Sequence, residues 1–206
     1  MFAVLAVASL VVGNLAAIMQ TNIKRMLAYS TVSHMGFILL AFMAGSIGAT
    51  AGLYYAITYA LMAAAGFGIL MVLSNDDIEC EEIKDLAGLN QRHAWFAFLM
   101  LLVMFSMAGI PPLMGFYAKF GVIMVLLKFH HVWLSVFAVV MSLIGAFYYL
   151  HVVKVMYFDE PTHDQPVGSN YAAKFFLSVN AFLLVLWGVM PQTMIDWCAR
   201  ALENTL

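Results

Sequence analysis

A single lysine, Lys119, interrupts a long apolar run of the sequence. It is the only formal charge between Trp95 and Leu127. A lysine at the centre of a lipid-facing helix costs about 2.5–3.5 kcal/mol on insertion scales, so such a residue usually faces protein or a water-filled path. Pro111 and Pro112 stand eight and seven residues before it. The charge and the helix breakers constrain this segment more than any other, and they predict that it carries function.

The composition is that of a membrane protein with several spans. Of the 206 residues, 65% are hydrophobic and 10% are charged, whereas a soluble domain carries about 25% charged residues. A net charge of −2 argues against a nucleic-acid partner. Cys80 and Cys198 are far apart and form no CxxC or Cys/His cluster, which argues against a zinc site or a structural disulfide. Residues 1–14 lack a charged leader and a cleavage site, so we expect a span there and not a signal peptide.

The apolar segments predict an all-α integral membrane fold with six transmembrane helices. A helix needs about 20 mostly apolar residues to cross the hydrocarbon core. Six segments qualify: 1–19, 25–45, 53–74, 94–127, 132–157 and 173–190. The fourth would extend about 51 Å against a core of about 30 Å, and it contains the proline pair. We therefore expect two half-helices, 94–108 and 113–127, whose break packs against protein or water because lipid cannot satisfy the free carbonyls.

The connections between these helices differ in positive charge. Lysine and arginine mark the cytoplasmic loops of membrane proteins. One set of loops holds or flanks six basic residues and the other set two: Lys24, Arg25, Lys84, Arg92, Lys154 and Lys174 against Lys128 and Arg200. The first set is therefore predicted to be cytoplasmic, with both termini outside.

The loops and the tail give weaker signals. Loop 74–93 carries six carboxylates against two basic residues, and is either a solvated connection or a contact with a neighbouring subunit. Loop 158–170 is rich in turn formers. Residues 191–206 predict an amphipathic helix along the outer interface. Its apolar side is expected to hold Met194, Trp197, Ala201 and Leu202.

Lys119 and His34 are the main candidates for proton transfer. Gly115 precedes the lysine by four residues on the same helix face, which lets another helix or water approach closely. A buried amine loses the solvation that stabilises its charge, so it can exchange a proton; the alternative is a lysine that snorkels to the interface. His34 falls midway along the second span, where an imidazole suits a proton relay. The alternative is a core histidine with one satisfied hydrogen bond.

Secondary candidates lie on the second and fifth predicted helices. They are polar groups near the histidine and a triplet on roughly one helix face: Tyr29 and Ser30; Tyr148, His151 and Lys154. The triplet is either a proton entrance or a set of ordinary interfacial residues. Two intramembrane amides, Asn14 and Asn180, predict hydrogen bonds between helices.

The sequence contains no motif for a redox cofactor. It has no GxGxxG, P-loop, haem-binding or iron–sulfur cysteine pattern, and no metal-ligand cluster. We therefore expect this chain to bind no cofactor or metal. Any redox activity must then belong to partner proteins.

Two stretches carry a resemblance to a known family. They are QTNIKRMLAYSTVSHMGFILLAF (20–42) and DLAGLNQRHAWFAFLMLLVMFSMAGIPPLMGFYAKF (85–120). They resemble the antiporter-like membrane subunits of respiratory complex I, the proton-translocating NADH–quinone oxidoreductase. The GIPP break followed by GFYAKF is similar to the subunit N branch, since the subunit M branch has a glutamate in place of Lys119. YYLHVVKVMYFDEP (148–161) and VMPQTMIDWC (189–198) also match that branch, so the resemblance covers essentially the whole chain.

The resemblance implies a fold and roles for two residues. Members of the family have fourteen transmembrane helices, including two inverted five-helix repeats. This chain resembles the second repeat (1–157) and the final helix with its tail (158–206), so we expect it to be a fragment of a longer protein. By the same resemblance, Lys119 matches the proton-carrying lysine of the broken helix and His34 the histidine of the central polar axis. The glutamate and two further lysines of the first repeat have no counterpart here.

The resemblance also implies a function. The chain would be part of the NADH:quinone oxidoreductase translocase of the respiratory chain, carrying part of a proton channel across the bacterial inner membrane. Its partners would be the lipid bilayer and the other membrane subunits of complex I. NADH, FMN, iron–sulfur clusters and quinone, for example ubiquinone, would be bound by partner subunits. Two alternatives remain open: a subunit of a multi-subunit Na+/H+ antiporter, or a scaffold fragment that does not pump.

Overall fold

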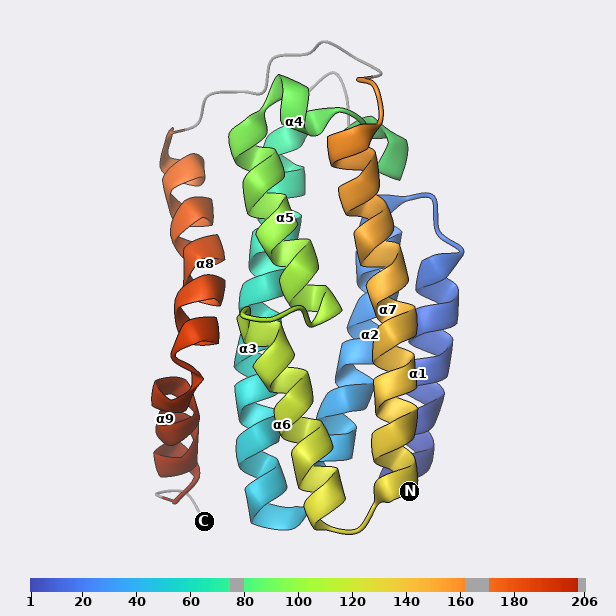
Figure 1. Ribbon diagram of the computed structural model, residues 1–206, viewed down its shortest axis with the longest axis vertical. Coiled ribbons are helices and arrows are strands. Elements are labelled where there is room, and N and C mark those ends of the chain that lie inside the picture. The colour runs from blue at the N-terminus through green and yellow to red at the C-terminus, as the bar shows by residue number, and fades with distance from the viewer. Residues whose placement is uncertain (75–79, 162–170, 204–206) are drawn as a thin grey trace.

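The protein is built from helices that run along its long axis. The computed structural model describes residues 1–74, 80–161 and 171–203. Within these residues the chain forms nine α-helices and one short 3₁₀ helix. Their bounds are α1 Phe2–Ile18, α2 Ile23–Phe42, α3 Gly45–Leu73, η1 Ile83–Leu86, α4 Leu89–Arg92, α5 Ala94–Ala108, α6 Met114–Lys128, α7 Val132–Phe158, α8 Tyr171–Val189 and α9 Pro191–Glu203. In Figure 1, α3 and α7 run most of the height of the molecule, and α5 and α6 follow one another along the same direction.

The expected helices are present, and most of their ends lie within three residues of the predicted ones, but α3 begins at Gly45, eight residues before its predicted start at 53. Among the described residues, three helices are long and apolar enough to cross a membrane: Ile47–Leu73, Val132–Phe158 and Tyr171–Val189. Phe2–Ile18 and Ala94–Ala108 are apolar but shorter. The all-α membrane fold is therefore confirmed, whereas six complete spans remain a prediction.

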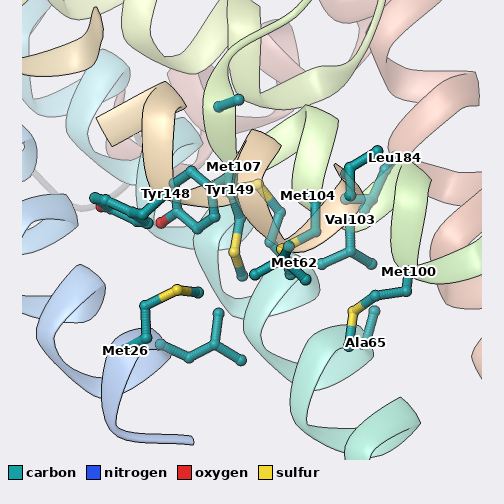
Figure 2. Packing of buried hydrophobic residues seen from close by; sticks show 14 of the residues in the cluster. Met26, Met62, Ala65, Met100, Val103, Met104, Met107, Tyr148, Tyr149 and Leu184 are labelled. Carbon is teal, nitrogen blue, oxygen red and sulfur yellow. The ribbon is translucent and has the colours of Figure 1, made fainter. Parts of the chain in front are cut away.

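Methionines from three helices fill the centre of the molecule. They come from α2, α3 and α5 and are at most 2% exposed: Met26, Met62, Met100, Met104 and Met107. Figure 2 shows these side chains among Tyr148, Tyr149 and Leu184, which come from α7 and α8. An unbranched thioether side chain fills irregular gaps between helices. α5, which ends at the helix break, packs against α3 and α7.

The predicted acidic loop is folded onto the start of α2. Ile23 N donates to Glu81 O at 2.7 Å, and Ile83 N donates to Thr21 O at 2.9 Å. Lys24 Nζ lies 3.3 Å from Glu81 Oε1. The described part of this loop is therefore neither fully solvated nor free, because it pairs with the protein's own helix ends.

The basic residues separate between the two ends of the molecule. The α1–α2 turn, the segment 80–92, the end of α7 and the start of α8 lie towards one end, while the α2–α3 and α6–α7 turns and α9 lie towards the other (Figure 1). This arrangement matches the grouping of loops used to predict orientation. Residues 75–79 and 162–170, which include parts of both predicted loops, lie outside the described residues.

Cys80 provides a chemical marker of the docked loop. Its side chain is 5% exposed, and burial, together with the nearby Asp85 carboxylate, raises the pKa of the thiol to about 11. Since the thiolate is the reactive form, we expect Cys80 to resist N-ethylmaleimide at neutral pH and to react faster as the pH rises towards that pKa. Mass spectrometry of the labelled native protein measures the rate, and unfolding in detergent should remove the protection. Rapid labelling of the native protein at neutral pH would contradict the docking.

The predicted C-terminal helix is present as α9. Its position along the outer interface stays a prediction, and residues 204–206 lie outside the described residues. α9 contacts α3 and α8. Met194 and Cys198 are 7% and 2% exposed, whereas Trp197 is 54% exposed. The side of α9 that packs against the other helices is therefore formed by Met194 and Cys198.

Candidate functional site

The predicted broken helix is confirmed. α5 ends at Ala108 and α6 begins at Met114. Gly109 ends α5 with φ of 87°, in the left-handed region that glycine adopts without a side-chain penalty. Pro111 and Pro112 follow, and neither has a backbone N–H to continue the helix.

The break frees carbonyls at the end of α5, and Lys119 binds two of them. The carbonyls of Phe105 and Ser106 accept hydrogen bonds from the backbone N–H after the helix, at 3.1 and 3.0 Å. Those of Met107 and Ala108 accept from Lys119 Nζ at 2.8 and 3.1 Å. The lysine therefore replaces the backbone donors that a continuous helix would supply. It also lies at the negative end of the α5 dipole, which stabilises a cation.

The lysine side chain is enclosed by protein. Lys119 is 6% exposed, and its Nζ lies 5.7 Å from the centroid of the Phe37 ring, within the range of a cation–π contact. A Cβ atom added to Gly109 would lie 3.0 Å from Lys119 Cδ. A snorkelling lysine is therefore excluded, because the amine is bound inside the protein and not at an interface.

The break itself packs against protein, as expected. Gly115 N donates to Ser106 Oγ at 3.1 Å, which ties the start of α6 to α5. A Cβ atom on Gly115 would overlap the Ser106 carbonyl oxygen. On the other side, a Cβ atom on Gly188 of α8 would overlap the Pro112 carbonyl oxygen. Gly115 and Gly188 thus allow α6 and α8 to pack closely against the residues at the break.

His34 is hydrogen-bonded through both ring nitrogens. Its Nδ1 lies 2.8 Å from Tyr55 OH, and its Nε2 lies 3.0 Å from Tyr149 OH. The Tyr59 ring lies beside the imidazole, with 4.7 Å between ring centroids. The residue is 3% exposed. The structure therefore shows a histidine between two hydroxyls, from α3 and α7, and not a core histidine with a single bond.

The polar cluster continues towards α1. Tyr148 and Tyr149 are adjacent on α7, with ring centroids 4.4 Å apart. Tyr148 OH donates to Asn14 Oδ1 at 3.1 Å, and Asn14 Nδ2 donates to Leu10 O at 2.9 Å. The predicted helix–helix bond of Asn14 is confirmed. The second amide, Asn180, leaves its Oδ1 without a hydrogen-bond partner among the described residues.

Phe37 lies between the lysine and the histidine cluster. It follows His34 by three residues on α2, and its ring stacks on the Tyr55 ring with 5.6 Å between centroids. The same Phe37 ring makes the cation–π contact with Lys119 Nζ. Among the described residues no direct hydrogen bond joins Lys119 to His34.

The secondary candidates on α2 have local partners. Ser30 is buried, and its hydroxyl donates to Leu27 O at 2.7 Å. Tyr29 is half-buried and packs against the core. Thr31 and Tyr59 share a short hydrogen bond between their hydroxyls. Of these groups, Tyr59 lies beside the His34 ring, whose nitrogens face Tyr55 and Tyr149 instead.

The predicted triplet on α7 is divided by depth. Tyr148 is 4% exposed and belongs to the polar cluster. His151, one turn further on, lines a cavity at the end of the helix. Lys154 is exposed, and its Nζ lies 2.6 Å from Asp159 Oδ1. The three residues are therefore arranged from the interior to the surface.

Several functional groups of this site are absent from the sequence-based candidates. They are the aromatic partners of the two main residues and the glycine that ends α5: Phe37, Tyr55, Tyr59, Tyr149 and Gly109. The spacing of Tyr55 and Tyr59, four residues apart on one helix face, was the available signal. It shows that both tyrosines share a face, but not that this face meets His34.

The described residues show no group of three or more His, Cys, Asp or Glu side chains that could hold a metal ion. Cys80 and Cys198 are both free and buried. The chemistry available to the site, among the residues that the structure describes, is therefore proton exchange by an amine, an imidazole and hydroxyls.

The fold and the site define a helical membrane protein of the transport type, in which a discontinuous helix exposes backbone groups to a charged side chain. The sequence matches the family described as "NADH:quinone oxidoreductase/Mrp antiporter, TM" over residues 1–145. The chain belongs to this family.

Relatives and solved structures agree with this assignment. NADH-quinone oxidoreductase subunit N from Neisseria gonorrhoeae is 82% identical over 207 residues, covering 100% of this chain and 43% of that protein. A chain of respiratory complex I from Thermus thermophilus with bound aureothin has a TM-score of 0.84 at 30% identity, covering 95% of this chain and 44% of the other. A chain of the Mrp complex from Dietzia sp. DQ12-45-1b has a TM-score of 0.87 at 22% identity, covering 98% and 46%, and shows the fold alone.

These comparisons confirm the resemblance to subunit N sequences, which was based on the residues around the break. The chain spans less than half the length of the relatives that it matches. What the whole protein does is therefore a matter for proposal.

Proposed function

We propose that this chain forms part of the proton-translocating membrane unit of an NADH:quinone oxidoreductase. Its own role is to move protons through the membrane, while partner subunits bind NADH, FMN, iron–sulfur clusters and quinone. The observation that carries this proposal is the buried Lys119 amine, held by two carbonyls of a broken helix. The similarity to a subunit N protein supports the choice of complex.

Lys119 suits reversible protonation because its two bonds survive the loss of a proton. The charged amine has three N–H donors. The neutral amine keeps two, which is enough for the carbonyls of Met107 and Ala108. Its lone pair is then available to accept a proton from water. The lysine can thus store and release a proton without leaving either carbonyl unpaired.

His34 suits a relay because both of its ring nitrogens already face hydroxyls. A neutral imidazole donates through one nitrogen and accepts through the other, and the charged ring donates through both. A tyrosine hydroxyl can serve as donor or acceptor, so Tyr55 and Tyr149 match every protonation state of the ring. A proton gained at one nitrogen can therefore leave from the other.

In this mechanism the histidine and the lysine exchange protons through water that passes Phe37. Quinone reduction in partner subunits drives the cycle by shifting charges along the membrane axis. Each shift changes whether the protonated or the neutral form of the Lys119 amine is favoured. The other membrane subunits of complex I are the partners.

The proposed topology has six spans, α1, α2, α3, α5 with α6, α7 and α8, which correspond to the second repeat (1–157) and the final helix (158–206) of the family. The end with the basic loops faces the cytoplasm of a bacterium, and both ends of the chain lie outside.

A cation/proton antiporter is the rival function, supported by the fold shared with the Mrp complex. The two differ in what drives transport. If the complex I proposal is right, NADH oxidation should change the pH of the lumen of membrane vesicles without a sodium gradient. Proton movement that requires sodium and not NADH would favour the antiporter. Unchanged transport after loss of both Lys119 and His34 would favour a scaffold.

Replacing His34 tests the relay directly. In the assembled complex, His34→Gln should slow NADH-driven proton pumping, because the amide side chain keeps hydrogen bonds to the tyrosines but does not titrate. Fluorescence quenching of a pH-sensitive dye in vesicles measures the rate. His131→Gln, the same substitution in the α6–α7 turn, is the matched control and should leave pumping unchanged. Equal rates for the two variants would remove His34 from the mechanism.

A further inference from the structure

A cavity of about 450 Å³ lies at the end of the molecule that carries the basic loops. Its walls come from the α1–α2 turn, from η1 with its flanking residues and from the last turns of α7. The lining residues are Gln20, Thr21, Glu82, Ile83, Lys84, Ala87, His151, Val155, Asp159 and Glu160. In Figure 1, α7 extends beyond the end of α1, and the segment with η1 covers the space beside it. The cavity thus opens where α1 is too short to cover α7.

The cavity lies at one end of a seam between α1 and α7, the end that carries the basic loops. His151 lines the cavity, and Tyr148 precedes it by three residues, about 4.5 Å along the helix axis. Gln20, in the turn after α1, lines the cavity. Asn14, on α1 itself, is buried. Tyr148 and Asn14 are hydrogen-bonded to one another. The seam therefore has a polar mouth at one end and the tyrosine pair beside His34 at the other.

We propose that this cavity is the opening through which protons reach the His34 cluster, with His151 as the first proton-carrying side chain. This inference rests on the proposed function, because it supplies protons to the same histidine and lysine. A proton moves from cavity water to the His151 imidazole, and from its second nitrogen to water beside Tyr148. Tyr148, Tyr149 and then His34 complete the route. Only N–H and O–H bonds are formed and broken, so no further reactant is needed.

The charges around the mouth favour this role. The lining carries three carboxylates, Glu82, Asp159 and Glu160, against one lysine, Lys84. Lys84 lies 2.8 Å from Glu82, and Lys154, outside the lining, lies 2.6 Å from Asp159. A cleft with an excess of one sign of charge raises the local concentration of the opposite ion. Since Lys84 and Lys154 pair with two of the three carboxylates, the charge of Glu160 is the excess that attracts protons to the mouth beside His151.

Blocking the mouth with charge tests the route. In the assembled complex, Thr21→Cys places a thiol in the cavity wall. A membrane-impermeant cationic methanethiosulfonate reagent, added to inverted vesicles, should lower NADH-driven proton pumping by more than half relative to the same vesicles before labelling. An anionic reagent of similar size should have a smaller effect. The native cysteines Cys80 and Cys198 are buried, and the parent complex treated with the same reagents reports any reaction elsewhere.

Gln91→Cys is the matched control, because Gln91 is exposed at the same end but does not line the cavity. Its labelling should leave pumping unchanged. Equal effects of the label in the two variants would overturn the proposal. So would unchanged pumping of the Thr21→Cys complex when mass spectrometry shows that its introduced thiol is fully labelled.

Chemical rescue tests His151 separately from the shape of the cavity. His151→Ala should slow pumping in weakly buffered medium, and added imidazole should restore a large part of the rate, because a diffusible base replaces the missing side chain. A structural role for His151 would not respond to imidazole, so absence of rescue would contradict the assignment. If Lys119 variants also pump normally, the proposed function itself fails. If they do not pump while labelling of the Thr21→Cys complex has no effect, only the opening is wrong.

Discussion

Lys119→Met is expected to abolish most NADH-driven proton pumping, with a loss of roughly a hundredfold, the usual scale for a positioned proton-transfer group. Methionine fills a similar volume but neither titrates nor donates hydrogen bonds. The carbonyls of Met107 and Ala108 would lose their donor, at a cost of about 1–3 kcal/mol for each buried unsatisfied group. Pumping is measured in vesicles after blue-native electrophoresis has shown that the complex assembles.

Lys128→Met is the matched control for this experiment. Lys128 is the last residue of the same helix, α6, and it is exposed. The same charge is removed, but no buried carbonyl loses a partner. We expect assembly and pumping close to those of the parent complex. Comparable losses in both variants would show that the charge of α6, and not the buried amine, matters.

Gly115→Ala is expected to destabilise the protein by about 3 kcal/mol, the upper part of the range for overpacking in a well-packed core. The added methyl would overlap the Ser106 carbonyl oxygen, which is backbone and cannot rotate away. α6 would have to move from α5, and the bond from Gly115 N to Ser106 Oγ would be lost. A fall in the thermal unfolding temperature of the purified complex, or failure to assemble, measures the effect.

Gly121→Ala serves as its control on the same helix. A Cβ atom at Gly121 meets nothing within 4 Å, and alanine favours a helix over glycine by about 1 kcal/mol. We expect stability to be unchanged or slightly higher. A destabilised Gly121→Ala, or a stable Gly115→Ala, would contradict the close packing of the half-helices at the break.

The helices and the break could be predicted because their causes are local. Twenty apolar residues in a row predict a span wherever they occur, and two adjacent prolines end a helix whatever its neighbours are. The half-helices were therefore predicted to within a residue of their observed ends. For Lys119 the sequence left two alternatives, a buried amine and a snorkelling lysine, and the structure shows the first.

The partners of the site could not be predicted, because they depend on how helices rotate against one another. Tyr55 and Tyr149 lie 21 and 115 residues from His34. Each tyrosine is one of several aromatic residues in an apolar helix. No pattern in the sequence shows which residue of another helix it contacts. Lys119 Nζ donates to the backbone carbonyls of Met107 and Ala108, and the pattern of side chains in a sequence does not show which carbonyls face a lysine.

The most direct test of proton storage at the break is the number of protons translocated per NADH oxidised by the Lys119→Arg complex, reconstituted in liposomes. Arginine keeps the charge and the donors for the α5 carbonyls but does not release a proton in proteins. If the amine cycles between charged and neutral forms, the ratio must fall below that of the parent complex while the complex remains assembled. An unchanged ratio would contradict the proton-carrying role of Lys119 and leave it a structural cap for the broken helix.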